Sequence, residues 1–538
     1  MKNRHKKKST MASATAVVPR ALGNFPAHTG ASRTSQQLGS WQPYLGSADT
    51  DTLMDLPALT SRSRDLTRNN GIAAGAIQTK SDNVVGIGLR LNAIPEWKLL
   101  GKTQEWASEW GRDVERRFRL WAEGTGCDAA RERNFAGLTT LVYKSRLFNS
   151  DALALPIWQP VQGEQFATRL FVLESDRLCN PNFSFDTQSR RGGIDIDEYG
   201  RALFYNIRTT HPGDIFTGSM VPGVWEKIPA TTPWGRKRVI HWASKDRPGQ
   251  TRGKPIFSSV MQQFKMLDRY ASAELDAATV NAMIAAFIET PMEHESLLAM
   301  FDGDESKIKP YMDTKAAPQN RARLKSGAIV PLYPGEKLSA FNPGRPAAGF
   351  ASFMESVLRH IATGLNLPYE LLLKDFSKTN YSSARAALLE AWRYFRSERQ
   401  GLTDYWAKPV YELWLEEAVN AGIVEAPDFY QNKAAYCRSR WIGSGRGWVD
   451  PVKEAQAAEI RMDAGLSTLE AECAEQGLDW EEVLHQQARE MQLRNELGLP
   501  MPVRTKPPPG EAPGDTPEPD DMKVNPLNLQ EPETDEDQ

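Results

Sequence analysis

Hydrophobic side chains recur at helical spacing in several parts of the chain. One run covers residues 106–121, and a shorter one covers 350–364. Another spans 388–414 and contains Pro409, where we expect a kink. A long helix should begin at Pro255, a residue suited to a first helical turn, with this apolar face: Ile256, Val260, Phe264, Leu267, Ala271, Leu275 and Ala278. Each run keeps its apolar residues on one side, so we predict helices that pack against a core.

Alternating apolar and polar residues predict a β-rich region between the helix at 106–121 and the helix that begins at Pro255. The sequence GGIDIDEYGRALFYNIR (192–208) contains two alternating runs that meet near residues 198–200, which is typical of a hairpin. We expect further strands at 86–92, 152–158, 169–174 and 236–242. The predicted fold class is therefore α+β and mainly helical.

Capping residues predict where other helices begin. Asp450 precedes a proline, and Ser467 and Asp479 each open the pattern of a capping box. Ser382 or Ser383 suits the N-cap of the helix that carries the 388–414 stripe. The last part of the chain before residue 500 should therefore be helical.

The two ends of the chain differ from its centre in composition. Residues 501–538 hold ten acidic residues, three basic residues and nine prolines, whereas the first eight residues hold five Lys or Arg. Such segments cannot bury enough apolar area to become ordered. We expect disorder over 1–52, basic at first and then rich in Ser and Ala, and over 501–538. The basic end is either a solvated tail or an arm that contacts nucleic acid or an acidic partner.

Overall charge and cysteine usage exclude some classes of protein. The 538 residues carry a net charge of −3, which argues against a protein that coats nucleic acid electrostatically. The longest apolar stretch contains charged residues, so we expect no membrane contact. The four cysteines lie too far apart for a metal knuckle or a disulfide framework, and we expect free thiols: Cys127, Cys179, Cys437 and Cys473.

The sequence lacks the patterns of well-known catalytic sites. It contains no GxxxxGK[ST], no HExxH, no GxSxG and no GxGxxG between a strand and a helix. Asp195 and Asp197 point the same way on a strand, but nothing nearby completes a site, and a solvated face is the preferred interpretation. We therefore expect no enzyme, no cofactor and no metal, and a structural or interaction role.

Three long segments resemble a known family. They are SRDLTRNNGIAAGAIQTKSDNVVGIGLRL (63–91), YSSARAALLEAWRYFR (381–396) and DPVKEAQAAEIRMDAGLSTLEAECAEQGLDWEEVLHQQARE (450–490). Together they are similar to phage portal proteins of the lambda type, from about residue 50 to residue 495. The resemblance implies a portal-type fold and a ring of twelve subunits at one vertex of the capsid.

The resemblance also implies the partners. Double-stranded DNA would pass non-specifically through the central channel during packaging and ejection. The terminase large subunit would dock during packaging, and head-completion or connector proteins would dock later. The major capsid protein or a scaffold would surround the ring, which would reside in the virion and, during assembly, in the host cytoplasm.

The family architecture divides the sequence into regions. An α/β wing is expected first, then two stem helices around a small mixed clip, a tunnel loop, a long wing helix and a helical crown. Their expected bounds are 53–254 for the wing, 255–291 and 346–366 for the stem helices, 292–345 for the clip, 367–385 for the tunnel loop, 386–420 for the long wing helix and 421–500 for the crown.

The resemblance implies that the tunnel loop faces DNA. Its cations and polar residues are the candidate site residues: Lys374, Lys378, Asn380, Tyr381, Ser382 and Arg385. The alternative for these residues is an ordinary solvated loop followed by a helix cap. A few cations at a constriction could steady a duplex, whereas a strongly positive lining would hold each phosphate and slow its passage.

Two other functions remain open from the sequence. A scaffold or adaptor of capsid assembly that forms no ring would also have charged ends and long helices. A DNA-processing enzyme of the packaging machinery is the third alternative, and it would need a nucleotide-binding loop or a carboxylate metal cluster, neither of which is visible.

Overall fold

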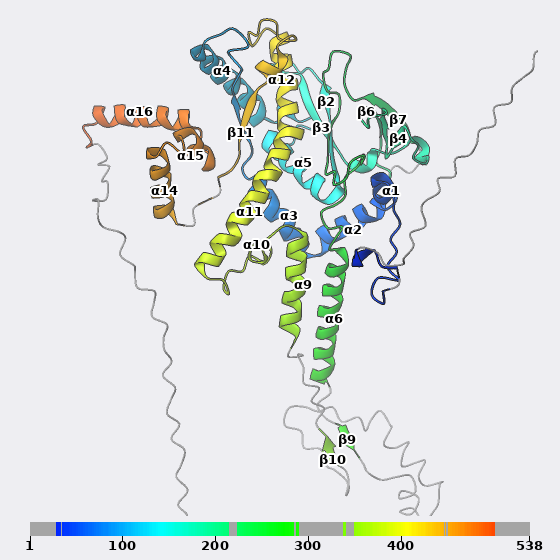
Figure 1. Ribbon diagram of the computed structural model, residues 1–538. Helices are drawn as coiled ribbons and strands as arrows, with labels where there is room; N and C mark the ends of the chain where they lie inside the picture. Colours follow the sequence, from blue (N-terminus) through cyan, green and yellow to red (C-terminus); the bar gives the residue numbers. More distant parts are fainter. Residues whose placement is uncertain are drawn as a thin grey trace, which may run out of the picture. The chain divides into compact units, whose positions relative to one another are not determined.

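The computed structural model describes residues 28–33, 35–214, 223–283, 287–289, 337–339, 349–445, 447 and 450–500 (Figure 1). The chain divides into two compact units, Met1–Val449 and Asp450–Gln538. Most of the expected clip, the far end of the expected first stem helix, the first part of the segment 1–52 and the whole of 501–538 lie outside the described residues. Within the described part, no helix has the length and apolar character needed to cross a membrane.

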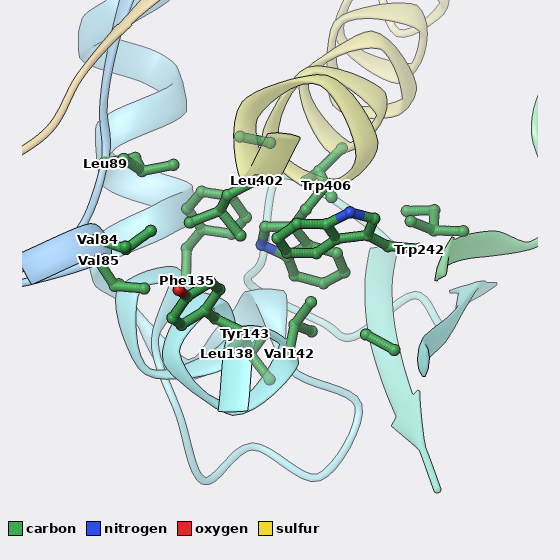
Figure 2. Packing of buried hydrophobic residues seen from close by; sticks show 14 of the residues in the cluster. Val84, Val85, Leu89, Phe135, Leu138, Val142, Tyr143, Trp242, Leu402 and Trp406 are labelled. Atoms are coloured by element: carbon green, nitrogen blue, oxygen red, sulfur yellow. The ribbon is translucent and has the colours of Figure 1, made fainter. Parts of the chain in front are cut away.

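A helical core forms the centre of the first unit. Its buried faces come from α2 (Leu56–Asn69), α3 (Gly71–Val84), α4 (Gln104–Glu123), α5 (Phe135–Asn149), α11 (Tyr381–Leu402) and α12 (Lys408–Asn420). The predicted 106–121 stripe is confirmed, because Trp110, Val114, Phe118 and Trp121 are buried in this core. Figure 2 shows part of the packing, with Trp406 beside Phe135.

The helix from Tyr381 to Asn420 is continuous but irregular. Between α11 and α12, residues Thr403–Ala407 form a π-helical turn. Pro409 follows two residues after this turn, and since it has no N–H it cannot complete the regular hydrogen-bond pattern. The irregularity expected near Pro409 is therefore this π-helical turn. This turn places Trp406 inside the core, where its indole N–H donates to Thr139 Oγ1 at 2.9 Å.

Two antiparallel sheets make up most of the predicted β-rich region. The first has the order β3-β2-β8, from β2 (Asp151–Trp158), β3 (Thr168–Leu173) and β8 (Ile240–Ala243). The second has the order β4-β5-β6-β7, from β4 (Arg190–Arg191), β5 (Ile194–Ile196), β6 (Ala202–Arg208) and β7 (Trp225–Pro229). The pairing of β5 with β6 confirms the predicted hairpin.

A third, two-stranded sheet joins distant parts of the chain. The strand predicted at 86–92 is β1 (Arg90–Ala93), and it pairs antiparallel with β11 (Ser439–Ile442). The remaining short elements are α10 (Tyr369–Leu373), α13 (Lys433–Tyr436) and the 3-10 turns Thr29–Ala31, Thr125–Cys127, Ser175–Arg177 and Pro181–Phe183.

The N-terminal segment is ordered earlier than we expected. Helix α1 (Ala48–Leu53) begins inside the segment 1–52, for which the sequence suggested disorder. Its Asp49 is buried and accepts hydrogen bonds from the backbone N–H of Thr251 at 2.7 Å and from the Thr251 hydroxyl at 3.0 Å. Arg191 adds an ion pair at 3.2 Å. These partners lie more than a hundred residues away in sequence, so local composition gave no sign of them.

Two antiparallel helices lie in the part of the chain where the stem is expected. They are α6 (Met261–Met283) and α9 (Phe350–Gly364), which run side by side in Figure 1. Tyr270 of α6 contacts the rings of Phe350 and Phe353 of α9. Helix α9 confirms its prediction, whereas α6 begins six residues later than Pro255 because residues 256–260 form turns. Two short strands, β9 (Phe287–Glu289) and β10 (Lys337–Ser339), pair antiparallel in the region between the helices.

Over residues 450–500, the described part of the second unit, the helices are α14 (Pro451–Asp463), α15 (Leu469–Glu475) and α16 (Trp480–Glu496). Asp450 and Asp479 are the N-caps that the sequence predicted, and each carboxylate accepts backbone N–H groups. The cap of α15 was predicted wrongly. It is Thr468 rather than Ser467, since the Thr468 hydroxyl accepts the Ala471 N–H at 3.2 Å.

A buried ion pair joins the first sheet to the segment that follows β8. Asp151 opens β2 and is fully buried, where it binds the Arg252 guanidinium and accepts the Gly253 N–H at 2.7 Å. His241 Nε2 lies 3.4 Å from the same carboxylate. Burial by itself raises the pKa of Asp151, but the Arg252 charge and these neighbours outweigh it and hold the pKa well below its usual range.

We expect Asp151→Asn to lower the free energy of unfolding by about 3–5 kcal/mol, because Arg252 would be left as a buried charge without a counter-charge. Chemical denaturation at neutral pH measures the loss. Because the pKa of Asp151 is lowered in the folded chain, its contribution is complete above the ordinary value of 3.8 and is lost as the pH falls further. The difference in free energy of unfolding between the wild type and Asp151→Asn should therefore become smaller in acid.

The matched control is Asp246→Asn. Asp246 forms an exposed ion pair with Lys254 at 2.8 Å, and such pairs contribute about 0–1 kcal/mol. Equal losses in the two variants would contradict a structural role for the buried pair.

Candidate nucleic-acid interface

The expected tunnel loop is a short connection between two helices. Helix α10 ends at Leu373, and Lys374 follows in the left-handed conformation, with φ 58° and ψ 33°. The Lys374 N–H donates to the Glu370 carbonyl, which closes the last helical turn. The Lys374 side chain is exposed to solvent. The loop therefore leaves the helix in a defined direction with a cation at its first position.

Hydrogen bonds within the loop fix its backbone. The Asp375 carboxylate accepts the Ser377 N–H at 3.0 Å, and the hydrogen bonds from Ser377 lower the pKa of Asp375. The Thr379 N–H donates to the Phe376 carbonyl at 3.2 Å, and the Thr379 hydroxyl donates to Glu370 at 3.4 Å. The loop is thus folded against its own helix.

The second loop cation has a partner that the sequence did not reveal. Lys378 Nζ lies 3.6 Å from Glu355 of α9, and the same carboxylate accepts from Arg359 at 2.8 Å. Glu355 is the i−4 neighbour of Arg359 on its helix, but its contact with Lys378 depends on the tertiary packing of α9 beside the loop. This carboxylate offsets part of the positive charge of the loop.

Asn380 ends the loop and caps α11. Its side-chain oxygen accepts the Ser383 N–H at 2.8 Å, and its backbone is extended, with φ −73° and ψ 162°. The prediction of Ser382 or Ser383 as the cap is therefore wrong, because both residues already lie in the first turn of the helix. The helix begins two or three residues earlier than the serines suggested.

The structure brings the six candidate residues together at one place. Lys374, Lys378 and Asn380 lie on the loop, and Tyr381, Ser382 and Arg385 lie on the first turns of α11. All are exposed except Arg385, which is half-buried, and 48% of Tyr381 is accessible. Among the described residues, neither Lys374 nor Arg385 pairs with a carboxylate. The cluster offers cations and hydroxyl groups to a polyanion and holds no acid–base pair for catalysis.

Helix α11 connects this cluster firmly to the core. The buried Lys80 ammonium of α3 donates to the Tyr394 hydroxyl at 2.7 Å. Arg146 of α5 binds Glu398, and Arg399 donates to the backbone carbonyl of Val84 at 3.0 Å. Burial lowers the pKa of Lys80 to about 7. The position of the loop is thus set by a helix with several polar contacts to other elements.

One further group of side chains has the composition of a metal site. Ligand atoms of Glu174, Asp176 and His211 lie within 4.8 Å of one another. However, His211 Nδ1 accepts the Gly213 N–H at 3.0 Å, so the imidazole proton is on Nε2, which lies 3.1 Å from Glu174. Asp176 is also bound by Arg64. Since the Gly213 N–H occupies His211 Nδ1 and Arg64 pairs with Asp176, the group is not a set of free ligands.

Comparison with known proteins assigns the family. The sequence model described as "Phage portal protein, lambda family" matches residues 34–399. The portal protein of Escherichia phage N15 is 36% identical over 490 residues, which cover 88% of this chain and 92% of the relative. Portal protein B of Escherichia phage lambda is 35% identical over 490 residues, with 88% and 91% covered.

The chain belongs to the lambda family of phage portal proteins. Portal proteins of this family are structural, non-enzymatic components of the phage head. The resemblance found in the sequence is thus confirmed, and so are the portal-type α+β fold and the absence of an enzymatic role for this portal protein.

Solved structures give more distant matches to this portal protein. The virion of a native gene transfer agent particle contains a chain with a TM-score of 0.41 and 14% identity, with 87% of this chain and 98% of that one covered. A portal protein of the HK97 family from Corynebacterium diphtheriae gives a TM-score of 0.30 and 13% identity, with 65% and 92% covered. The family assignment depends on the sequence matches.

Replacing Lys80 by Met should change how the stability of the portal depends on pH. Because the pKa of Lys80 falls from 10.5 to about 7 on folding, the unfolded chain binds more protons between these values. Wild-type stability should therefore rise relative to Lys80→Met as the pH increases from 7 to 10. Thermal melting of both proteins at several pH values tests this, and a constant difference would contradict a lowered pKa.

Replacing Lys374 by Gly should remove a loop cation without loss of stability. Glycine adopts a left-handed backbone without steric cost. We therefore expect the free energy of unfolding to stay equal to that of the wild type or to rise by about 0–1 kcal/mol, which thermal melting measures. Lys378→Gly is the matched control, since Lys378 lacks a positive φ and pairs with Glu355. A greater loss of stability in Lys374→Gly than in Lys378→Gly would contradict a left-handed backbone at position 374.

Proposed function

We propose that copies of this portal protein close into a ring at one capsid vertex and that double-stranded DNA passes through its centre during packaging and ejection. The observation that carries the proposal is the exposed loop 374–380, which presents cations at the end of a helix anchored in the core. In a ring, every copy would present the same loop at the same height, so the loops would together form the narrowest part of the channel.

The chemistry of the loop suits passage better than tight binding. Phosphate contacts dominate the affinity of proteins for duplex DNA, so a densely cationic lining would hold the strand. The loop and the first turns of α11 together carry three cations, Lys374, Lys378 and Arg385, and Glu355 lies 3.6 Å from Lys378. Weak contacts of this kind are independent of base sequence because they involve the backbone of DNA.

The proposed ring is built from head-to-tail contacts. Identical subunits around an axis meet through two different surfaces, and the contact closes when the rotation divides a full turn. We propose twelve copies, in line with the family to which the chain belongs. A scaffold or adaptor that forms no ring remains the alternative, and it predicts a monomer or dimer in solution.

Several other proteins should contact the ring. We propose that the terminase large subunit docks during packaging and that head-completion or connector proteins replace it afterwards. The major capsid protein or a scaffold should surround the wing. The ring would thus assemble in the host cytoplasm and remain in the virion.

Lys378→Glu should reduce the number of DNA-filled heads and leave ring formation unchanged. Charge reversal places a carboxylate at each constriction next to Glu355, which would repel the phosphates. Complementation of a portal-deficient phage, with measurement of packaged DNA, tests the first effect. Mass measurement and negative-stain images of the purified variant test the second.

The matched control is Lys254→Glu, which reverses an exposed lysine that is not part of the loop and pairs with Asp246. It should package DNA like the wild type. Normal packaging by Lys378→Glu would contradict the assignment of the loop, whereas a wild-type protein that stays monomeric or dimeric would contradict the ring itself. Lys374→Gly, which removes a cation without reversing charge, should give an intermediate yield.

A further inference from the structure

A rigid loop on the second sheet holds two phenylalanines in solvent. The buried Asn180 amide donates to the Ser184 carbonyl and to Asp186, both at 2.9 Å, and its oxygen accepts the Gly193 N–H at 2.8 Å. Asp186 also accepts the Gly192 N–H at 2.8 Å. These bonds tie the loop to the turn between β4 and β5, so its conformation is set before any partner arrives.

This loop adopts a conformation that costs free energy. Asn182 and Phe183 are both left-handed, with φ 53° and 52°, and a bulky residue rarely occupies that region. The result is that 61% of Phe183 and 95% of Phe185 are accessible to solvent. Strain that exposes apolar side chains gains nothing for the isolated fold, and such strain is concentrated at binding sites.

Arg208 packs against the exposed Phe183 and the half-buried Trp225. The Arg208 guanidinium carbon lies 5.7 Å from the ring centre of Phe183 and 5.6 Å from that of Trp225, and these two rings meet edge to face. Its Nε is buried without a hydrogen-bond partner. In the part of the chain that the structure describes, no carboxylate pairs with this guanidinium. We call Phe183, Arg208 and Trp225, together with the exposed Phe185 two residues further along the same loop, the aromatic–arginine surface.

The chemistry of this surface selects a particular kind of ligand. Exposed aromatic rings bind proline-rich segments, whose rings lie flat against them and which lose little entropy on binding. A guanidinium without a counter-charge favours a carboxylate and can bind it through two parallel hydrogen bonds. The best ligand is therefore a segment that alternates prolines with acidic residues.

The chain itself contains such a segment. Residues 507–521 read PPPGEAPGDTPEPDD and hold six prolines, five acidic residues and no basic residue. We propose that the aromatic–arginine surface binds this segment of a second copy of the chain. The presence of a second copy nearby rests on the proposed ring, whereas the match between the surface and the segment does not. Contact between copies through this segment would add to the head-to-tail contacts that close the ring.

Binding can be measured with a synthetic peptide of residues 505–522 carrying a fluorescent label. Titrated with the full-length chain, it should show saturable binding that weakens as NaCl is increased. Phe185→Ala should weaken binding about tenfold, and since Phe185 is almost fully exposed, this change should leave the fold intact. Arg208→Gln should also weaken binding about tenfold and reduce its salt dependence.

Two matched controls test specificity. Tyr199→Ala removes another aromatic side chain that is 87% exposed, and it should leave binding unchanged. A peptide with its acidic residues replaced by amides should bind at least tenfold more weakly to the wild-type chain. The proposal is overturned if the peptide does not saturate, or if Phe185→Ala binds it as well as Tyr199→Ala does.

Photo-crosslinking of the full-length chain tests whether the ligand comes from a second copy. A crosslinking amino acid at position 185 in unlabelled protein, mixed with isotopically heavy protein, should join position 185 to heavy peptides from residues 501–538. Crosslinks confined to one chain, or to other regions, would overturn the proposal. Peptide binding by a chain that forms no ring would contradict the proposed ring and leave the match between surface and segment standing.

Discussion

The structure of the first unit depends on the burial of one aromatic face of the helix from Tyr381 to Asn420. Trp406, Tyr411 and Trp414 are fully buried, and they contact Phe118 and Phe135 from two other helices. A buried tryptophan contributes about 3–5 kcal/mol relative to alanine. Because these side chains fill the centre of the core, the helix cannot shift along its axis without opening cavities. The loop at its beginning therefore keeps its place relative to the sheets.

Buried polar contacts make the position of this helix more specific than apolar packing alone would. Lys80 binds Tyr394, Arg146 binds Glu398, and Arg399 donates to the carbonyls of Asn83 and Val84. A shift by one turn would leave these groups buried without partners, which is far more costly than the net gain from the bonds themselves. The aromatic residues thus supply stability, and the polar residues define one register.

The sequence predicted elements whose signal is local. The 106–121 stripe, the 192–208 hairpin and helix α9 follow from periodicity, because burial on one face leaves its mark within each element. Segments that depend on distant partners were missed. Helix α1 is ordered because Asp49 binds Thr251, and no pattern within residues 1–52 contains that information.

In the candidate site, too, the contacts that depend on distant residues were the ones that the sequence did not predict. Its six residues were proposed through the family resemblance, and the structure places three of them on the loop and three on the first turns of α11. Glu355 was missed, because its contact with Lys378 depends on the packing of two helices. The cap of α11 was misplaced, because asparagine and serine are equally good caps and only the backbone conformation of Asn380 decides between them.

The distribution of charge along the chain agrees with a proposed DNA channel better than its net charge suggests. Residues 450–538 hold 22 acidic and seven basic residues, so the part before them has an excess of positive charge although the whole chain carries −3. The loop 374–380 belongs to the positive part, yet Glu355 and Asp375 lie beside its lysines. A loop that combines cations with nearby carboxylates attracts a polyanion at short range and offers no continuous row of sites to hold it. Rigid placement of a weak contact, rather than a strong contact, is what passage of DNA through a proposed ring requires.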